Sequence, residues 1–172
     1  VLGRPEFKNY NAGIVIQAYL PDAEGLQKRL LDFAKERVAA GGAPLKMRLV
    51  KGANLQMESV ISSLKGWENP VYRSKVEVDA NYMHILDVAL LPENIRDCHA
   101  GVASHNYFTI AYAHLLAEKK GVSGYVTFVM LEGMANNLPR WNRKRQKQNI
   151  LYTPVVKATH FLNYTAYLVR DL

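Results

Sequence analysis

Two kinds of apolar pattern alternate along the chain. Short apolar runs, which are typical of buried strands, occur at about residues 13–20, 45–53, 97–106, 125–133 and 149–156. The segments between and after these runs, at about 22–39, 54–66, 79–91, 107–121 and 161–172, carry apolar residues at helical spacing. Because parallel strands need a long crossover, strands separated by helices of this length predict a parallel α/β sheet.

Local signals add helix ends and narrow the fold class. Asp22 stands where it can cap the first helix, and Gly121 stands just past the end of the fourth. The pattern alone is compatible with a doubly wound sheet or a barrel. No G-x-G-x-x-G sequence follows any predicted strand. The dinucleotide-binding fingerprint is therefore missing, which favours a barrel.

The second predicted strand carries two cations. One face of it holds Leu45, Met47 and Leu49, and the other holds Lys46, Arg48 and Val50. In a barrel the first set would pack against the outer helices and the second would point into the lumen. An interior charge such as that of Arg48 is costly unless a polar or anionic partner or a ligand meets it. The strand therefore predicts a binding site inside the barrel.

Polar residues also gather at the carboxyl ends of the predicted strands. They are Gln17 in the first, His105 and Asn106 in the third, Glu132 in the fourth and Tyr152 in the fifth. Barrel enzymes build their active sites at this edge, so we interpret the set as a candidate active site. Gly52 and Ala53 follow Lys51, and their small size lets a phosphate group approach the main-chain N–H groups and the lysine.

Composition places the chain among globular proteins. Of its 172 residues, 49% are hydrophobic and 22% are charged. The single cysteine, Cys98, excludes an intrachain disulfide, and no apolar run approaches the roughly 18 residues needed to span a bilayer. A cytoplasmic location is therefore expected. The five histidines show no metal-binding spacing, so no metal site is expected.

The basic character is local. The cluster in residues 140–147 consists of Arg140, Arg143, Lys144, Arg145 and Lys147. Without these five charges the net charge of +7 falls to +2. A non-catalytic module could use this run to bind nucleic acid or an anionic membrane. Charge runs are more often solvated surfaces, and no nucleic-acid partner is expected.

Seven short motifs occur in an order that matches a known family. They are QAYLPDA, RLVKGAN, SKVEVDANY, ASHN, MLEGMA, LYTPVV and AYLVR, and the resemblance that they carry extends from about Gly13 to Arg170. In this order they resemble the flavin-dependent proline dehydrogenase domain, especially that of the bifunctional proline utilization A proteins. The resemblance implies a distorted (βα)8 barrel in which this chain, as one part of the domain, supplies strands four to eight.

The resemblance also implies an activity and partners. Such domains bind FAD, oxidise L-proline to pyrroline-5-carboxylate and pass electrons to a membrane quinone. A pyrroline-5-carboxylate dehydrogenase domain or partner would consume the product. The location implied is the cytoplasm, including the inner face of the membrane. The family's first three strands would lie outside these residues, and five strands alone would leave open edges and an exposed apolar lumen. Either the missing strands are supplied from elsewhere, or this chain is an incomplete fragment that is inactive by itself.

Site residues follow from the same resemblance. Gln17 and Arg48 would hydrogen-bond the isoalloxazine, with Arg48 near the flavin N5, where its charge stabilises the reduced ring. Further cofactor contacts would come from Val50, Lys51, Gly52, Ala53, Lys75, Ser104, His105, Asn106 and Leu131, of which Lys75, Ser104 and His105 would hold the phosphate, ribose or adenine portion. Tyr152 would contact the proline ring, and Arg170 would bind its carboxylate.

The sequence departs from the family pattern at four positions. Asp171 stands where a second carboxylate-binding arginine is expected, and its charge would repel the substrate. Asn54 and Leu55 stand in place of a tyrosine and a tryptophan, and Glu132 stands in place of a histidine. The Asp171 difference predicts weakened proline binding.

A different barrel enzyme is a rival interpretation. Lys51 ends a predicted strand beside Arg48. A lysine that is desolvated next to another cation can lose its proton and act as the nucleophile of a Schiff-base aldolase. Trapping with borohydride and a carbonyl substrate would distinguish such an enzyme from a flavoprotein.

Overall fold

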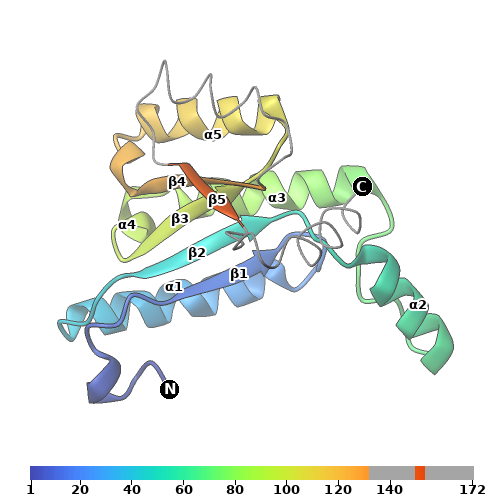
Figure 1. Cartoon of the computed structure of the whole chain (residues 1–172), viewed down its shortest axis with the longest axis horizontal. Coiled ribbons are helices and arrows are strands. Elements are labelled where there is room, and N and C mark those ends of the chain that lie inside the picture. The colour runs from blue at the N-terminus through green and yellow to red at the C-terminus, as the bar shows by residue number, and fades with distance from the viewer. Residues whose placement is uncertain (132–149, 154–172) are drawn as a thin grey trace, which may run out of the picture.

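The computed structural model of the protein describes residues 1–131 and 150–153 (Figure 1). Within them, five strands form one parallel sheet in the order β1-β2-β3-β4-β5. The strands are β1 (Gly13–Gln17), β2 (Leu45–Val50), β3 (Cys98–Ala103), β4 (Val126–Leu131) and β5 (Ile150–Thr153). Every neighbouring pair is parallel, and the spatial order follows the order in sequence without reversal. The predicted parallel α/β fold is confirmed.

Helices connect the strands. They are α1 (Ala23–Ala39), α2 (Leu55–Lys65), α3 (Lys75–Ala89), α4 (Pro92–Ile95) and α5 (Tyr107–Lys119), with short 3-10 turns η1 (Pro5–Phe7) and η2 (Ser123–Tyr125). Figure 1 shows α1, α3 and α5 alongside the sheet and α2 projecting away from it. In agreement with this projection, Ser62 is the only buried residue of α2.

The core lies between one face of the sheet and the helices. In β2, Leu45, Met47 and Leu49 are 4%, 0% and 0% exposed, and they belong to one cluster with buried residues of α1, α3 and α5. The alternate residues of β2 are only partly buried. The predicted division of this strand into an apolar face and a face with two cations is therefore confirmed.

Two of the predicted helix ends need correction. Asp22 occupies the N-cap position of α1, but its side chain makes no capping hydrogen bond. Helix α3 begins at Lys75, not at 79, because Ser74 and Glu77 form a capping box. Ser74 Oγ accepts from Glu77 N–H at 3.2 Å, and Glu77 Oε2 accepts from Ser74 N–H at 3.0 Å. By contrast, Gly121 follows α5 with a φ of +68°, as predicted.

A buried arginine joins the amino-terminal segment to α1. Arg37 is 8% exposed, and all of its hydrogen-bond acceptors within residues 1–131 and 150–153 are carbonyl oxygens. The acceptors are the carbonyl oxygens of Leu2, Phe7, Lys8, Tyr10 and Ala43. These bonds compensate for the loss of hydration of the guanidinium, and they fix residues 2–10 against the carboxyl end of the helix.

Candidate functional site

The site is built around the chain that leaves β2. The N–H groups of Ala18 and Tyr19 donate to the carbonyl oxygens of Val50 and Lys51, both at 2.8 Å. These two bonds continue the pairing of β1 and β2 past the ends of both strands. The Lys51-Gly52-Ala53 turn is thereby held beside the turn that follows β1.

Gly52 has a structural reason to be glycine. Its φ is +143°, and a Cβ atom at this position would lie 2.5 Å from Cγ of the Tyr19 ring. The sequence suggested that a small residue is needed here for a phosphate group to approach. The positive φ and the Tyr19 ring already account for the glycine, so its presence gives no separate indication of a ligand.

Arg48 lies on the partly buried face of β2, in register with Val15 of β1 and Gly101 of β3. Its Nε atom is buried and has no hydrogen-bond partner among the described residues. A buried N–H without an acceptor costs about 1–3 kcal/mol. The position therefore suits an acceptor atom from outside the described part of the chain.

Gln17 and Val50 share this face with Arg48. Gln17 ends β1 in register with Val50, two residues beyond the Val15–Arg48 pair. Tyr19 lies next to them. The pKa of its hydroxyl is raised, mainly by burial and to a lesser extent by the charge of Glu58, whereas a hydrogen bond with Gln17 lowers it. The structure thus brings together Gln17, Arg48 and Val50, as the sequence predicted.

Asp79 links the two lysines of the candidate site. Its Oδ1 lies 2.5 Å from Lys51 Nζ, and its Oδ2 lies 2.5 Å from Lys75 Nζ. Hydrogen bonds from Lys51 and then from Lys75 lower the pKa of the Asp79 carboxyl. Asp79 had no predicted role, although its i,i+4 spacing from Lys75 indicates an ion pair on one side of a helix.

This ion pair bears on the aldolase interpretation. A Schiff-base nucleophile must be an unprotonated amine. The carboxylate against Lys51 stabilises the ammonium form instead, and the Tyr82 ring, whose centroid is 5.8 Å from Nζ, adds a cation–π contact. The described geometry therefore favours a cationic Lys51 that attracts an anion.

Ser104, His105 and Asn106 follow β3 directly. Asn106 Oδ1 caps α5 by accepting from the N–H groups of Phe108 and Thr109, at 2.9 and 3.1 Å. Ser104 Oγ accepts from Asn106 N–H at 3.1 Å. The oxygens of Ser104 and Asn106 therefore have local structural partners, which explains both residue types without a ligand.

His105 makes a contact to the next strand. Its Nε2 atom accepts from the N–H of Leu131, at 3.0 Å, at the end of β4. Burial lowers the pKa of His105, which favours the neutral ring. The two residues that were predicted to contact different parts of a cofactor are thus joined to each other.

Other predicted site residues lie outside the described part. Tyr152 belongs to β5, where it pairs with Met130 of β4, but its side chain is outside the described set. Glu132, Arg170, Asp171 and the basic run 140–147 also lie outside it. Their assignments stay predictions.

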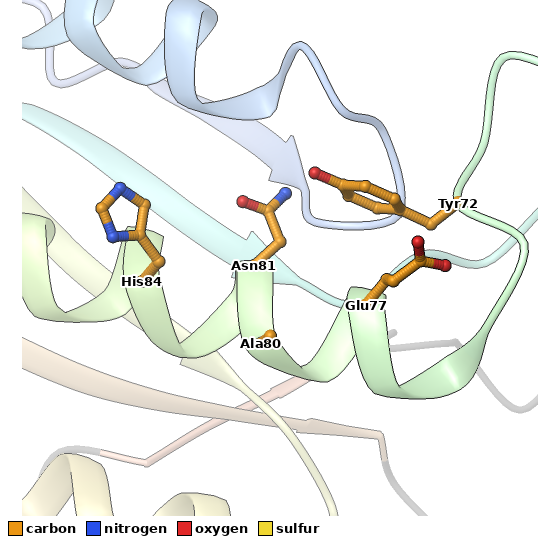
Figure 2. Close-up of a pocket in the computed structure, with 5 residues that line it drawn as sticks. All are labelled: Tyr72, Glu77, Ala80, Asn81 and His84. Carbon is orange, nitrogen blue, oxygen red and sulfur yellow. The ribbon is translucent and has the colours of Figure 1, made fainter.

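A surface hollow lies apart from these residues. It is lined by Tyr72, Glu77, Ala80, Asn81 and His84, which Figure 2 shows along α3 and the segment before it. Asn81 Nδ2 donates to the carbonyl oxygen of Ala18 at 2.9 Å, so one wall of the hollow anchors the turn after β1. The hollow contains none of the predicted cofactor residues. Its polar side chains from α3 have structural partners: Asn81 bonds to Ala18, Glu77 belongs to the capping box with Ser74, and His84 lies against Glu24.

Within residues 1–131 and 150–153, no three metal-ligating side chains come together. No helix in the same ranges is long and apolar enough to cross a membrane.

Comparison with known proteins decides the family. The family described as proline dehydrogenase matches residues 1–172. The chain belongs to the proline dehydrogenase family. Its sequence is 33% identical to the bifunctional protein PutA of Rhizobium meliloti over 170 residues, which are 93% of this chain and 13% of that protein. It is 29% identical to hydroxyproline dehydrogenase of Xenopus laevis over 127 residues, which are 71% of this chain and 26% of that protein.

Solved structures of this family have the same fold. Proline utilization A from Corynebacterium freiburgense superimposes with a TM-score of 0.90 at 47% identity, over 99% of this chain and 18% of that one. The protein from Bdellovibrio bacteriovorus, inactivated by N-propargylglycine, gives 0.85 at 40% identity, over 98% of this chain and 17% of that one. The proline dehydrogenase chain described here therefore spans less than a fifth of the length of these structures.

Proposed function

We propose that this chain is the carboxyl-terminal part of one proline dehydrogenase barrel domain and contributes strands four to eight of a distorted (βα)8 barrel. Five parallel strands in sequence order, with the core on one face, are compatible with a barrel wall. The opposite face, with Lys46, Arg48 and Val50, would line the lumen. The likeness to proline utilization A structures supports the same assignment.

The domain would bind FAD on the lumen face. The observation that carries this proposal is the buried Arg48 Nε, which has no acceptor in the described residues and suits an atom of a bound ring. Gln17 and Arg48 would contact the isoalloxazine, and Leu131 would pack beside it. Val50, Gly52 and Ala53 would contribute backbone groups. Lys51, Lys75, Ser104, His105 and Asn106 would face the phosphate, ribose and adenine portion.

The reaction would be oxidation of L-proline to pyrroline-5-carboxylate. FAD, when bound, supplies the acceptor for the hydride that leaves proline. Arg48 would stabilise negative charge on the ring through its fixed cation. Tyr152 would contact the proline ring, and Arg170 would bind the carboxylate. Asp171 would weaken that binding, so an Asp171→Arg variant is expected to lower KM for proline about tenfold, and an unchanged KM would contradict this role.

The wider context is also part of the proposal. Electrons would pass to a quinone, and a pyrroline-5-carboxylate dehydrogenase domain or partner would consume the product. We place the protein in the cytoplasm, with the run 140–147 docking to the anionic inner membrane surface. Binding to vesicles of anionic lipid should then fall with salt and with neutralisation of the run. Insensitivity to both changes would disprove membrane docking by this run.

The first experiment follows from Arg48. The purified protein is mixed with FAD, and its absorption spectrum is recorded anaerobically before and after L-proline is added. Bound flavin bands that bleach with proline would support both cofactor and reaction, whereas a folded protein that binds no flavin would contradict the FAD proposal. An Arg48→Met variant is expected to bind FAD at least tenfold more weakly. Arg29→Met, an exposed substitution on α1, is the matched control.

A further inference from the structure

His105 occupies a position where its protonation state has a chemical consequence. It follows β3 by two residues, and its ring reaches across to the last residue of β4. The Leu131 N–H points at Nε2 with a donor–acceptor distance of 3.0 Å. A ring nitrogen can accept this bond only when it carries no proton.

The accepting nitrogen determines where the proton lies. If Nε2 is unprotonated, the neutral ring carries its single proton on Nδ1. Burial lowers the pKa of His105, and no charged side chain among the described residues contributes to that shift. Glu132 follows Leu131 directly and lies outside the described residues, so its charge has to be varied in any test.

We propose that His105 is held by the Leu131 N–H as the neutral tautomer protonated on Nδ1, and that it therefore serves the cofactor site as an uncharged hydrogen-bond donor. Its ligand would be an oxygen acceptor in the phosphate or ribose portion of FAD. The inference rests on the proposed function for the identity of the ligand only. The tautomer itself follows from the contact between β3 and β4.

This assignment gives the lysines and the histidine around the site different roles. Lys51 and Lys75 carry positive charge, shared with Asp79. His105 would add a directional donor without adding charge. Because the same ring accepts from the last residue of β4, a ligand that bonds to Nδ1 would be positioned relative to the ends of both strands. His105 is thus both a ligand contact and a positioning residue for Leu131.

Nitrogen NMR of protein labelled at histidine tests the tautomer directly. At neutral pH the expected spectrum shows His105 protonated on Nδ1. A charged His105 or one protonated on Nε2 would overturn the proposal. The Nδ1-protonated tautomer should also be seen in a Glu132→Gln variant. If that variant loses the tautomer, Glu132 and not the Leu131 N–H is what holds it.

Two substitutions distinguish the roles of the two ring nitrogens of His105. His105→Gln can place an acceptor near the position of Nε2 but loses the donor at Nδ1, and His105→Asn does the reverse. Hydrogen exchange at the Leu131 amide should stay slow in the Gln variant and become at least tenfold faster in the Asn variant. Equal exchange in the two variants would contradict the role of Nε2 as acceptor.

Flavin binding tests the donor. His105→Gln is expected to weaken FAD binding about tenfold and leave riboflavin binding unchanged, since riboflavin lacks the phosphate and adenosine portion. Equal losses for both flavins, or no loss, would overturn the donor role. His84→Gln is the matched control. If the unmodified protein binds no flavin, the proposed function fails, while the NMR result still decides the tautomer.

Discussion

The ring of Tyr19 occupies the space that a side chain at Gly52 would need. A Cβ atom on Gly52 would lie 2.5 to 2.8 Å from three atoms of this ring, and Tyr19 is only 2% exposed. The ring is therefore held in place and cannot move away without opening the core. Through this contact, the turn after β1 determines the shape of the turn after β2, where the candidate site begins.

Gly52→Ala tests this contact. We expect it to lower the free energy of unfolding by about 2–4 kcal/mol, because it combines strain at positive φ with overpacking against a buried ring. Gly66→Ala is the control, since Gly66 also has positive φ (+65°) but has open space around it, and it should cost about 1–2 kcal/mol. Urea unfolding gives both values. Equal costs would show that the Tyr19 contact contributes nothing.

Arg37 should be needed for stability and replaceable by neither lysine nor methionine. Arg37→Met leaves the carbonyl oxygens of the amino-terminal segment without donors, and we expect a loss of about 2–4 kcal/mol. Arg37→Lys keeps the charge but not the guanidinium fork, so it should restore only a small part. Arg29→Met, on the exposed side of the same helix, should be nearly neutral in the same urea titration. A small effect of Arg37→Met would mean that residues 2–10 are held by other contacts.

Asp79 should make the free energy of unfolding depend on pH in the acid range. Its pKa in the folded protein is lowered from the ordinary value of 3.8 by Lys51 and Lys75, so the unfolded chain binds a proton more readily. The ion pairs therefore stabilise the fold fully above pH 3.8, and this contribution disappears as the pH falls through the lower folded value.

Asp79→Asn removes that contribution. We expect a loss of at most about 1 kcal/mol at neutral pH, because about a third of the side chain is exposed, and no difference from the unmodified protein once both are measured below the folded pKa. Thermal unfolding as a function of pH measures this. Asp32→Asn, which breaks the exposed Lys28–Asp32 pair, should have a smaller effect. A constant difference at all pH values would show that packing, not charge, is lost.

Cys98 should be chemically inert while the protein is folded. It is 1% exposed, and burial followed by the charge of Asp97 raises the pKa of its thiol to about 12. Since the thiolate is the reactive form, iodoacetamide should label Cys98 only after urea unfolds the protein. Mass spectrometry before and after unfolding checks this. Rapid labelling of the folded protein would mean that β3 opens readily from the helices that cover it.

Local patterns in the sequence were sufficient for the five strands, for helices α1, α2, α3 and α5, and for the two faces of β2, but they did not predict α4, and the helix expected at 161–172 lies outside the described residues. The alternation in residues 45–50 separated core positions from the face with Lys46 and Arg48, because side chains in a strand alternate whatever the rest of the chain does. The family resemblance predicted that Gln17 and Arg48 lie together, and the register of β1 and β2 places them on one face of the sheet. The start of α3 could also have been predicted, because Ser74 and Glu77 have the three-residue spacing of a capping box, but that prediction was not made.

The sequence by itself therefore determined the order of the five strands and of the helices α1, α2, α3 and α5, the core face of β2 and, through short motifs, the family. Only the tertiary structure decided that Asp79 joins Lys51 to Lys75, that Tyr19 explains Gly52, and that Leu131 fixes the tautomer of His105. The Lys51, Tyr19 and His105 contacts connect residues 26 to 33 positions apart. Local propensity and periodicity contain no information about such pairs, because their geometry depends on how the strands are placed side by side in the sheet.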